Sequence, residues 1–131
     1  MTKEDKELLI RDLSSRLPYG VKIFANNNIN TLEGIHIPDG VVEFNRCLSC
    51  DIEEVKPYLF PMSSMTEEQK KEYNYWKHDV PVCHYEYGDV IEEQELLESP
   101  ESFNYLIENH FDYYGLIPKG LALDATGKNI Y

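Results

Sequence analysis

Two turn signals constrain the first half of this chain more than any other feature. They are Asn26-Asn27-Asn28 and Pro38-Asp39-Gly40, and they separate three short extended runs, Gly20–Ala25, Leu32–Ile37 and Val41–Leu48. Asn tolerates left-handed backbone, Pro presets φ and Gly accepts a positive φ, so each signal predicts a tight reversal. Runs joined this closely pair with their neighbours, and we predict an antiparallel β-meander.

A fourth extended run, Val55–Phe60, contains Pro57 and is followed by Pro61. Proline cannot donate to a strand ladder, so we expect an edge strand or a strand exit here. Short strands linked so tightly can curl into a small barrel. A sheet covered by a helix would serve equally well.

Two helices are indicated before residue 78. Thr2 begins the first helix signal, an apolar stripe recurs at three- and four-residue steps at Leu9, Ile10, Leu13 and Leu17, and Pro18 ends it. Thr66 and Gln69 form a capping box that begins a second helix, expected to run to about Lys77.

The remainder of the chain contains one further helix signal. His78–Glu98 has a weak alternation, which suggests a strand or an extended loop ending at Gly88-Asp89. Ser99 as cap and Pro100 at the first helical position begin a third helix. We expect this helix to place His110 on its apolar face and to end near Gly115.

Together these elements predict an α+β fold, a small antiparallel β-element with about three helices packed on it. A chain of 131 residues has the commonest size of one domain. We expect a single domain, 1–131, with a helix and the β-meander over 1–61 and a helical, acidic part over 62–131. The apolar tail Leu116–Leu123 is expected to pack back onto the core.

The net charge of −12 is unevenly distributed. Residues 1–65 carry a net charge of −3 and residues 66–131 a net charge of −9, and no Lys or Arg occurs between Lys77 and Lys119. Phosphate backbones and anionic membrane surfaces both attract clustered cations. We therefore expect no direct nucleic-acid binding and no membrane binding, and a protein with a basic surface as partner.

Tyrosines lie among these acidic residues. A tyrosine is apolar along its ring and polar at its hydroxyl, which suits protein interfaces. Tyrosines beside carboxylates would recognise a surface rich in Arg or Lys. The alternative is that they line the core with their hydroxyls at its edge. The candidate binding residues are Tyr85, Tyr87, Asp89, Glu92, Glu93, Tyr113 and Tyr114.

The three cysteines are candidate metal ligands. Cys47 and Cys50 with Cys83 and His84 could supply four ligands to zinc. Adjacent side chains on an extended backbone point apart, however, which separates Cys83 from His84. We predict packed thiols and no metal.

Two pairs, His78-Asp79 and His110-x-Asp112, could act as acid and base. Neither accompanies a nucleophile motif, a glycine-rich phosphate loop or metal-ligand spacing. We predict no catalytic residues, no cofactor and no enzymatic activity.

The cysteine usage and the first residues favour a reducing compartment. Three cysteines cannot all pair within one chain, and Met1–Arg11 is charged, without the apolar stretch of a secretion signal. No run approaches the roughly 18–20 apolar residues that cross a bilayer. We expect a cytoplasmic protein with free thiols; its oligomeric state is left open.

Three segments carry a resemblance to a known family: Val55–Glu68, which contains Lys56-Pro57-Tyr58-Leu59-Phe60-Pro61, then His110–Leu123, and Leu13–Val21. They resemble a family of uncharacterised proteins from gut Bacteroidales and their phages and mobile elements. The resemblance covers roughly a third of the chain. It implies a mobile-element context and an SH3-like or similar small β-element followed by helices.

The leading functional hypothesis is a non-catalytic interaction protein of a phage or mobile element. Its acidic, Tyr-containing C-terminal half would bind a basic protein surface. One alternative is a DNA mimic that inhibits a host defence or another DNA-binding enzyme, with carboxylates in place of phosphates. The other is a small-ligand-binding protein or enzyme with an aromatic pocket.

Overall fold

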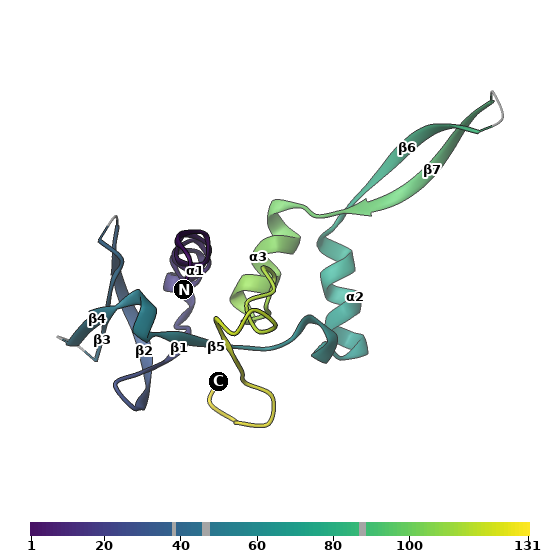
Figure 1. Ribbon diagram of the computed structural model, residues 1–131. Helices are drawn as coiled ribbons and strands as arrows, with labels where there is room; N and C mark the ends of the chain where they lie inside the picture. The colour runs from purple at the N-terminus through teal and green to yellow at the C-terminus, as the bar shows by residue number, and fades with distance from the viewer. Residues whose placement is uncertain (38, 46–47, 87–88) are drawn as a thin grey trace. The chain divides into compact units, whose positions relative to one another are not determined.

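The chain forms an α+β protein, as predicted. The computed structural model describes every residue except 38, 46–47 and 87–88, and over 78–96 it describes the backbone (Figure 1). Its contacts divide into two compact units. The sheet unit comprises Met1–Ser64 and Ile107–Tyr131, and the hairpin unit comprises Met65–Leu106.

Three α-helices, three short 3-10 helices and eight strands make up the described chain. The α-helices are α1 (Lys3–Arg16), α2 (Glu67–Trp76) and α3 (Pro100–Glu108), and the 3-10 helices are η1 (Leu17–Tyr19), η2 (Ile52–Glu54) and η3 (Met62–Ser64). The strands are β1 (Lys22–Ala25), β2 (Asn28–His36), β3 (Val41–Phe44), β4 (Leu48–Asp51), β5 (Lys56–Leu59), β6 (His78–Glu86), β7 (Asp89–Leu97) and β8 (Leu123–Asp124). No helix in the described part of the chain is long and apolar enough to cross a membrane.

The first helix begins and ends where the sequence predicts. The Thr2 hydroxyl accepts a hydrogen bond from Asp5 N at 3.0 Å, and the Asp5 carboxylate accepts one from Thr2 N at 3.3 Å. This reciprocal cap satisfies two amides that a helix start leaves unpaired. The chain then tightens into η1 at Pro18 and turns at Gly20, whose φ is +66°.

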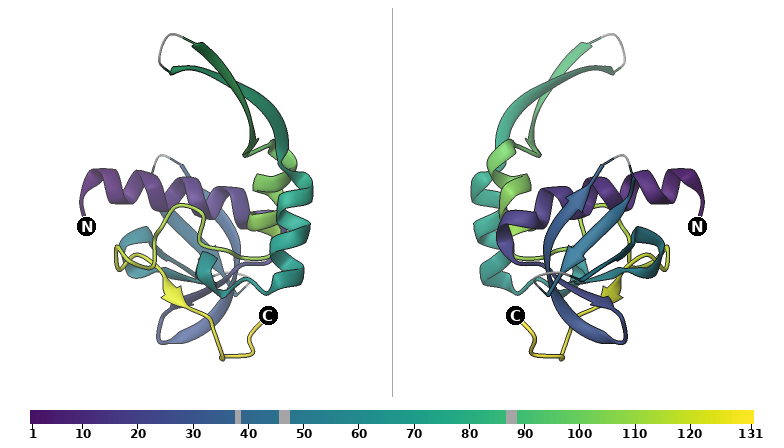
Figure 2. Two further views of the ribbon diagram at one scale, coloured as in Figure 1. Left: turned by 90° about the vertical axis from the view of Figure 1, so that its right-hand side faces the viewer. Right: turned by 90° about the vertical axis from the view of Figure 1, so that its left-hand side faces the viewer.

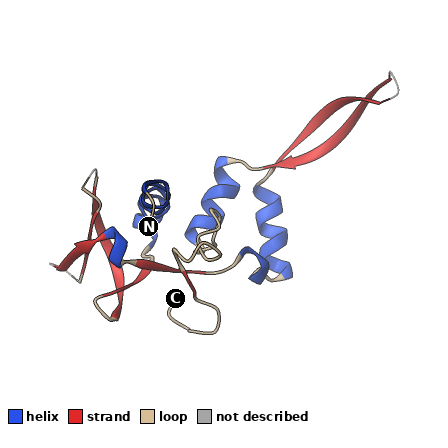
Figure 3. Cartoon of the chain, viewed as in Figure 1, coloured by secondary structure: helices blue, strands red, loops and turns tan. Residues whose placement is uncertain are grey.

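The sheet unit is built on six strands in the order β4-β3-β2-β1-β5-β8. Figure 3 draws the strands of the chain in red. Neighbouring strands are antiparallel except β5 and β8, which are parallel. The predicted meander is confirmed in β1, β2 and β3. Since β4 and β8 end the order on opposite sides, the pairings of the described strands leave the sheet open, and the SH3-like barrel stays a prediction.

Two asparagine turns shape the meander. Asn26 and Asn27 both have positive φ, +53° and +61°, and they join β1 to β2 through the Ala25–Asn28 pair. A two-residue loop of this kind matches the twist of the strands it connects. Asn45 also has a positive φ, +49°, and it ends β3. The single run predicted over Val41–Leu48 is therefore wrong, because it belongs to two strands.

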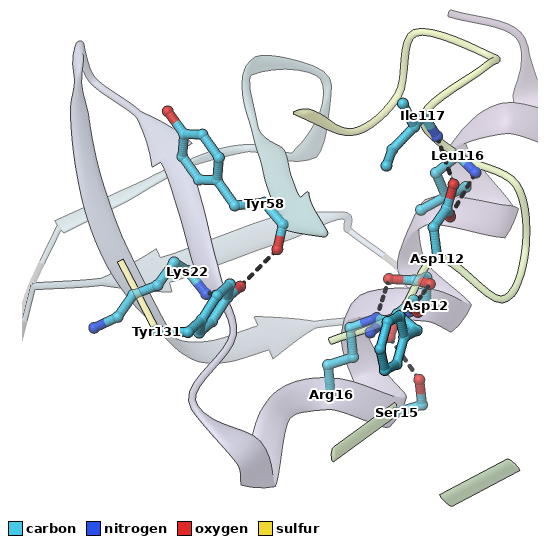
Figure 4. Close-up of polar contacts among 10 residues, drawn as sticks. Asp12, Ser15, Arg16, Lys22, Tyr58, Asp112, Leu116, Ile117 and Tyr131 are labelled. Carbon is cyan, nitrogen blue, oxygen red and sulfur yellow. Dashed lines mark hydrogen bonds and ion pairs between the residues drawn. The ribbon is translucent and has the colours of Figure 1, made fainter. Parts of the chain in front are cut away.

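Of the two expectations for the fourth run, the edge strand is wrong, while the strand does end at Leu59, just before Pro61. β5 lies between β1 and β8, and its Pro57 pairs with Ile23. At the next register position the Tyr131 hydroxyl bridges the two strands, as Figure 4 shows: it accepts a hydrogen bond from Lys22 N at 2.8 Å and donates one to Tyr58 O at 2.6 Å. Tyr131 thus satisfies one backbone group of β1 and one of β5, while β8 pairs with the other side of β5.

One side of this sheet is covered by α1, as the two views of Figure 2 show. Leu9 and Leu13 of α1 are fully buried against the apolar face of the strands. Leu116, Leu121 and Ala122 complete the same core, so the prediction that the tail packs back is confirmed. The remaining core residues are Val21, Ile23, Ala25, Leu32, Val42, Phe44, Ile52, Val55 and Leu59.

A fully buried ion pair within α1 also contacts the segment around Phe111 (Figure 4). Arg16 Nε donates to Asp12 Oδ1 at 2.8 Å and Arg16 Nη2 donates to Asp12 Oδ2 at 3.1 Å. Nη2 also donates to the carbonyl of Phe111. Burial raises the pKa of Asp12, and the bonds to Arg16 oppose that effect. Neither side chain has exposed surface. Each charge is therefore compensated by the other and not by solvent.

The third helix ends at Glu108, and the prediction that it reaches Gly115 is wrong. His110 has a φ of +63°, which a helix cannot contain, so it does not lie on the helix stripe where we expected it. Phe60 N donates to His110 O and Asp112 N donates to Phe60 O, both at 2.8 Å. Pairing with the end of β5 therefore diverts this segment from the helix.

The hairpin unit contains α2, the β6–β7 hairpin and most of α3. The capping box of α2 is confirmed, because Thr66 and Gln69 exchange hydrogen bonds of 2.8 and 3.1 Å. An extended segment before Gly88 was expected and is present as β6. The sequence pattern did not indicate β7, which pairs with β6 without interruption from His78–Leu97 to Glu86–Asp89.

Replacing Arg16 alone should destabilise the protein more than replacing both members of the ion pair. Arg16→Met leaves the Asp12 carboxylate buried without its partner, and we expect a loss of about 3–5 kcal/mol in the free energy of unfolding. The double variant Asp12→Leu/Arg16→Met removes both charges and should lose much less. Urea unfolding followed by circular dichroism measures both. Equal losses in the two variants would contradict the role of charge compensation.

Candidate interaction surface

The hairpin unit carries most of the negative charge of the protein. Met65–Leu106 contains three lysines and eleven carboxylates, a net charge of −8, whereas the sheet unit has a net charge of −4. The excess predicted for the C-terminal half is thus concentrated in the segment that forms α2, the hairpin and the start of α3.

Most of the acidic positions in the hairpin fall on one of its two faces. Along a strand, alternate residues share a face. Asp89, Glu93 and Glu95 are separated by even numbers of residues on β7 and share a face with the apolar Ile91, and Glu86 pairs with Asp89. Leu97, whose side chain is 43% exposed, follows in the same alternation. We call the four acidic positions, without Leu97, the acidic face.

The predicted binding residues are divided between the faces and the units. Within the hairpin, Tyr85 pairs with Val90 and Glu92 pairs with Cys83, positions that belong to the face opposite the acidic one. Tyr87 lies outside the described residues. The predicted set as a whole stays a prediction.

Tyr113 and Tyr114 belong to the sheet unit. Their rings meet edge to face at 5.1 Å, and Tyr113 is 40% exposed, whereas Tyr114 packs partly against the core. Their loop is held by Asp112, whose Oδ1 accepts from Leu116 N at 2.7 Å and whose Oδ2 accepts from Ile117 N at 2.9 Å (Figure 4).

Tyr73 fixes α2 to α3 within the hairpin unit. Its ring stacks on Tyr105, with centroids 6.4 Å apart and planes 15° apart, and its hydroxyl donates to the Glu98 carboxylate. The ammonium of Lys77 lies 4.4 Å from the centre of the same ring. Burial raises the pKa of Tyr105, and the nearby Glu72 raises it further. One side of α2 is therefore engaged in holding α3.

Hydrogen bonds of Ser99 hold the two ends of the hairpin together. Ser99 caps α3 as predicted, with its hydroxyl accepting from Ser102 N at 2.9 Å, and Ser102 Oγ accepts from Ser99 N at 2.7 Å. The Ser99 hydroxyl also bonds the carbonyl of Trp76, where α2 ends. The start of β6 and the end of β7 are thus anchored next to each other.

An aromatic pair remains exposed at the same place. Tyr75 is 77% exposed and Trp76 42% exposed, and their rings meet edge to face at 5.0 Å and 81°. None of the residues of α2 is buried. Our sequence interpretation missed this pair, although the run Tyr73-Asn74-Tyr75-Trp76 directly precedes the segment without lysine or arginine.

The proposed acid–base pairs have different surroundings. For His78 and Asp79 the structure describes the backbone. Both carboxylate oxygens of Asp112 accept loop amides. His110 stacks on Tyr131 at 3.8 Å and 15°, and burial, followed by the charges of Arg16 and Lys22, lowers its pKa to about 4. Its buried Nδ1 has no hydrogen-bond partner among the described residues.

The cysteine and histidine set considered for zinc is only partly described. Cys47 lies outside the described residues, and for Cys83 and His84 only the backbone is described. Cys50 is half-buried, and burial, then Glu54 and Asp51, raise the pKa of its thiol. Among the described side chains no group of three or more His, Cys, Asp or Glu residues could hold a metal ion.

Two shallow hollows mark the surface of the sheet unit. One of about 390 Å³ is lined by Lys3, Lys6, Glu7, Ile10 and Ile37. The other, of about 340 Å³, is lined by Phe24, Glu53, Glu54, Lys56, Tyr58 and Leu123. Both mix charges of the two signs with apolar side chains, and neither has the convergent polar groups that would specify a ligand.

Comparison with protein-family models, curated proteins and solved structures finds no match to this chain.

Trp76, the single tryptophan, should report the negative potential of its surroundings. At low ionic strength, caesium ions should quench its fluorescence at least about twofold more effectively than iodide, because the acid-rich unit attracts cations and repels anions. Stern–Volmer constants normalised to free N-acetyltryptophanamide measure this. The difference should vanish at high salt, and equal normalised constants at low salt would contradict it.

His110 should make the protein less stable as the pH falls. Its pKa is about 4 in the folded state and about 6.5 when unfolded, so between these values the unfolded chain binds a proton that the folded chain does not. The free energy of unfolding should fall by about 1–2 kcal/mol from pH 7 to pH 4, solvent screening allowed for. His110→Asn keeps a residue that accepts positive φ. In this variant the part of the fall in unfolding free energy that comes from His110 should be absent. Urea unfolding at several pH values compares the two, and parallel curves would contradict the assignment.

Proposed function

We propose that this is a non-catalytic interaction protein, of a phage or mobile element as the family resemblance implies, and that its hairpin unit binds a basic protein surface. The observation that carries the proposal is the acidic face. It lies on a hairpin whose strands contain no Lys or Arg. Glu86, Asp89, Glu93 and Glu95 would attract cationic side chains and speed their encounter with the hairpin.

The architecture of the hairpin supports a role in binding. In the described pairings β6 and β7 pair with each other and with no further strand. A two-stranded ribbon by itself is at best marginally stable in water, because it has no layer against which to bury a face. A partner that covers this ribbon would add stability that the chain itself does not supply.

Charge reversal on the acidic face tests the proposal. Glu93→Lys/Glu95→Lys places two cations where the partner's cations are expected, and binding should weaken at least about tenfold. The matched control is Glu53→Lys/Glu54→Lys, which makes the same change in net charge at two exposed residues of the sheet unit. Proteins captured by each form from the native host extract are identified by mass spectrometry, and binding is then measured between purified components.

The outcomes separate the competing functions. Basic partners retained by the control and lost by Glu93→Lys/Glu95→Lys support the proposal. Partners that bind both forms equally would overturn it. A partner that is a DNA-binding enzyme, with duplex DNA competing for the same site, would favour the DNA-mimic alternative.

A further inference from the structure

We propose that the aromatic pair Tyr75–Trp76, together with Leu97, anchors an Arg- or Lys-bearing segment of the partner at the base of the hairpin. This inference rests on the proposed function and adds the residues that hold the bound segment. The three side chains are named the aromatic anchor below.

Exposure of the anchor is a consequence of how α2 is held. Tyr73 faces Tyr105 and Glu98, so the neighbouring Tyr75 is turned away from α3 and is 77% exposed. The edge-to-face contact at 5.0 Å orients the Tyr75 and Trp76 rings at 81° to each other. Two large rings held in a defined geometry can contact a partner with little loss of side-chain entropy, a property of interface hot spots.

At the hairpin base the backbone brings the anchor residues close to the end of the strand that carries the acidic face. Leu97 ends the alternation that contains Glu93 and Glu95, and it pairs with His78, two residues after Trp76. Ser99, which bonds the Trp76 carbonyl, is two residues after Leu97. A segment lying along the acidic face would therefore reach the exposed Leu97 and the aromatic pair at the end of its path.

The chemistry of the pair favours a cation. Trp presents the most favourable aromatic face to an ammonium or guanidinium group, and Tyr follows. Glu72, which also hydrogen-bonds Tyr105, lies one turn before Tyr75 and Trp76 on α2, and Glu68 lies one further turn back, both exposed. Lys77 is engaged over Tyr73, which leaves Lys71 as the base one turn from Tyr75. A cation over the rings would thus be close to carboxylates as well.

The negative charge of the hairpin unit indicates which kind of partner can bind at the anchor. A second copy of the hairpin unit would bring a further net charge of −8 against the first, and nucleic acid or an anionic membrane would likewise be repelled. An extended segment with alternating cationic and aliphatic residues matches both the acidic positions of β7 and the apolar Leu97.

A defined peptide provides the probe. A fluorescein-labelled twelve-residue peptide of alternating Arg and Leu should bind the protein, as measured by fluorescence anisotropy, while a Glu and Leu peptide of the same length should not. In a separate titration with unlabelled peptide, the emission of Trp76 should change as the peptide binds. Because Trp76 is the single tryptophan, that signal comes from the anchor.

Two substitutions measure the contribution of the anchor. Tyr75→Ser should weaken peptide binding about tenfold, since it removes an exposed ring and one cation contact. Lys71→Glu should tighten binding, since it replaces the base next to Tyr75 with an acid. The matched control is Ile37→Ser, at a residue of the sheet unit that is 62% exposed, and it should leave binding unchanged. Circular dichroism confirms that each variant is folded.

Failure of the anchor and failure of the proposed function give different results. In one outcome, peptide binding depends on Glu93 and Glu95 but is unaffected by Tyr75→Ser, and Trp76 emission stays constant. That outcome would overturn the anchor and leave the proposed role of the acidic face standing. Absence of binding by the Arg and Leu peptide would overturn both. Equal binding of the Glu and Leu peptide would show simple apolar adhesion and would also overturn both.

Discussion

The guanidinium of Arg16 is the contact on which the rest of the sheet unit depends. It compensates the buried charge of Asp12 on α1 and bonds the carbonyl of Phe111, more than ninety positions further along the chain. Phe111 in turn pairs with Phe60 at the end of β5. One charged group therefore joins the helix, the sheet and the returning segment, and because it is fully buried its removal leaves an uncompensated carboxylate.

That connection explains why the end of the chain completes the sheet. After Phe111 the chain adds Leu116, Leu121 and Ala122 to the core and places β8 beside β5. It then inserts the Tyr131 hydroxyl between Lys22 and Tyr58. Although 41% of Tyr131 is exposed, its hydroxyl is enclosed by these two backbone groups, and burial raises its pKa. The sheet unit thus consists of two segments distant in sequence.

The sequence predicts those features that depend on residues close to one another in the chain. The caps at Thr2, Thr66 and Ser99 and the turn at Asn26 are fixed by residues within a few positions, and the structure contains all of them. The early end of α3, the interior place of β5 and the burial of Arg16 arise from contacts between remote segments, which no periodicity encodes. For the candidate site, the acidic excess could be read from composition. The exposure of Tyr75 and Trp76 could not, because it follows from Tyr73 taking the contact with α3.

β6 and β7 pair without interruption, so the number of residues between two positions of the ribbon, odd or even, decides whether they share a face. Its two faces differ in charge, and a strand reverses its facing with every residue. Loss or gain of one residue between Glu95 and Leu97 would put Leu97 on the face opposite Glu93 and Glu95, while a change of two would keep them in line. A change of length at this point therefore keeps the charge in line with the apolar end in even steps, and odd steps separate them.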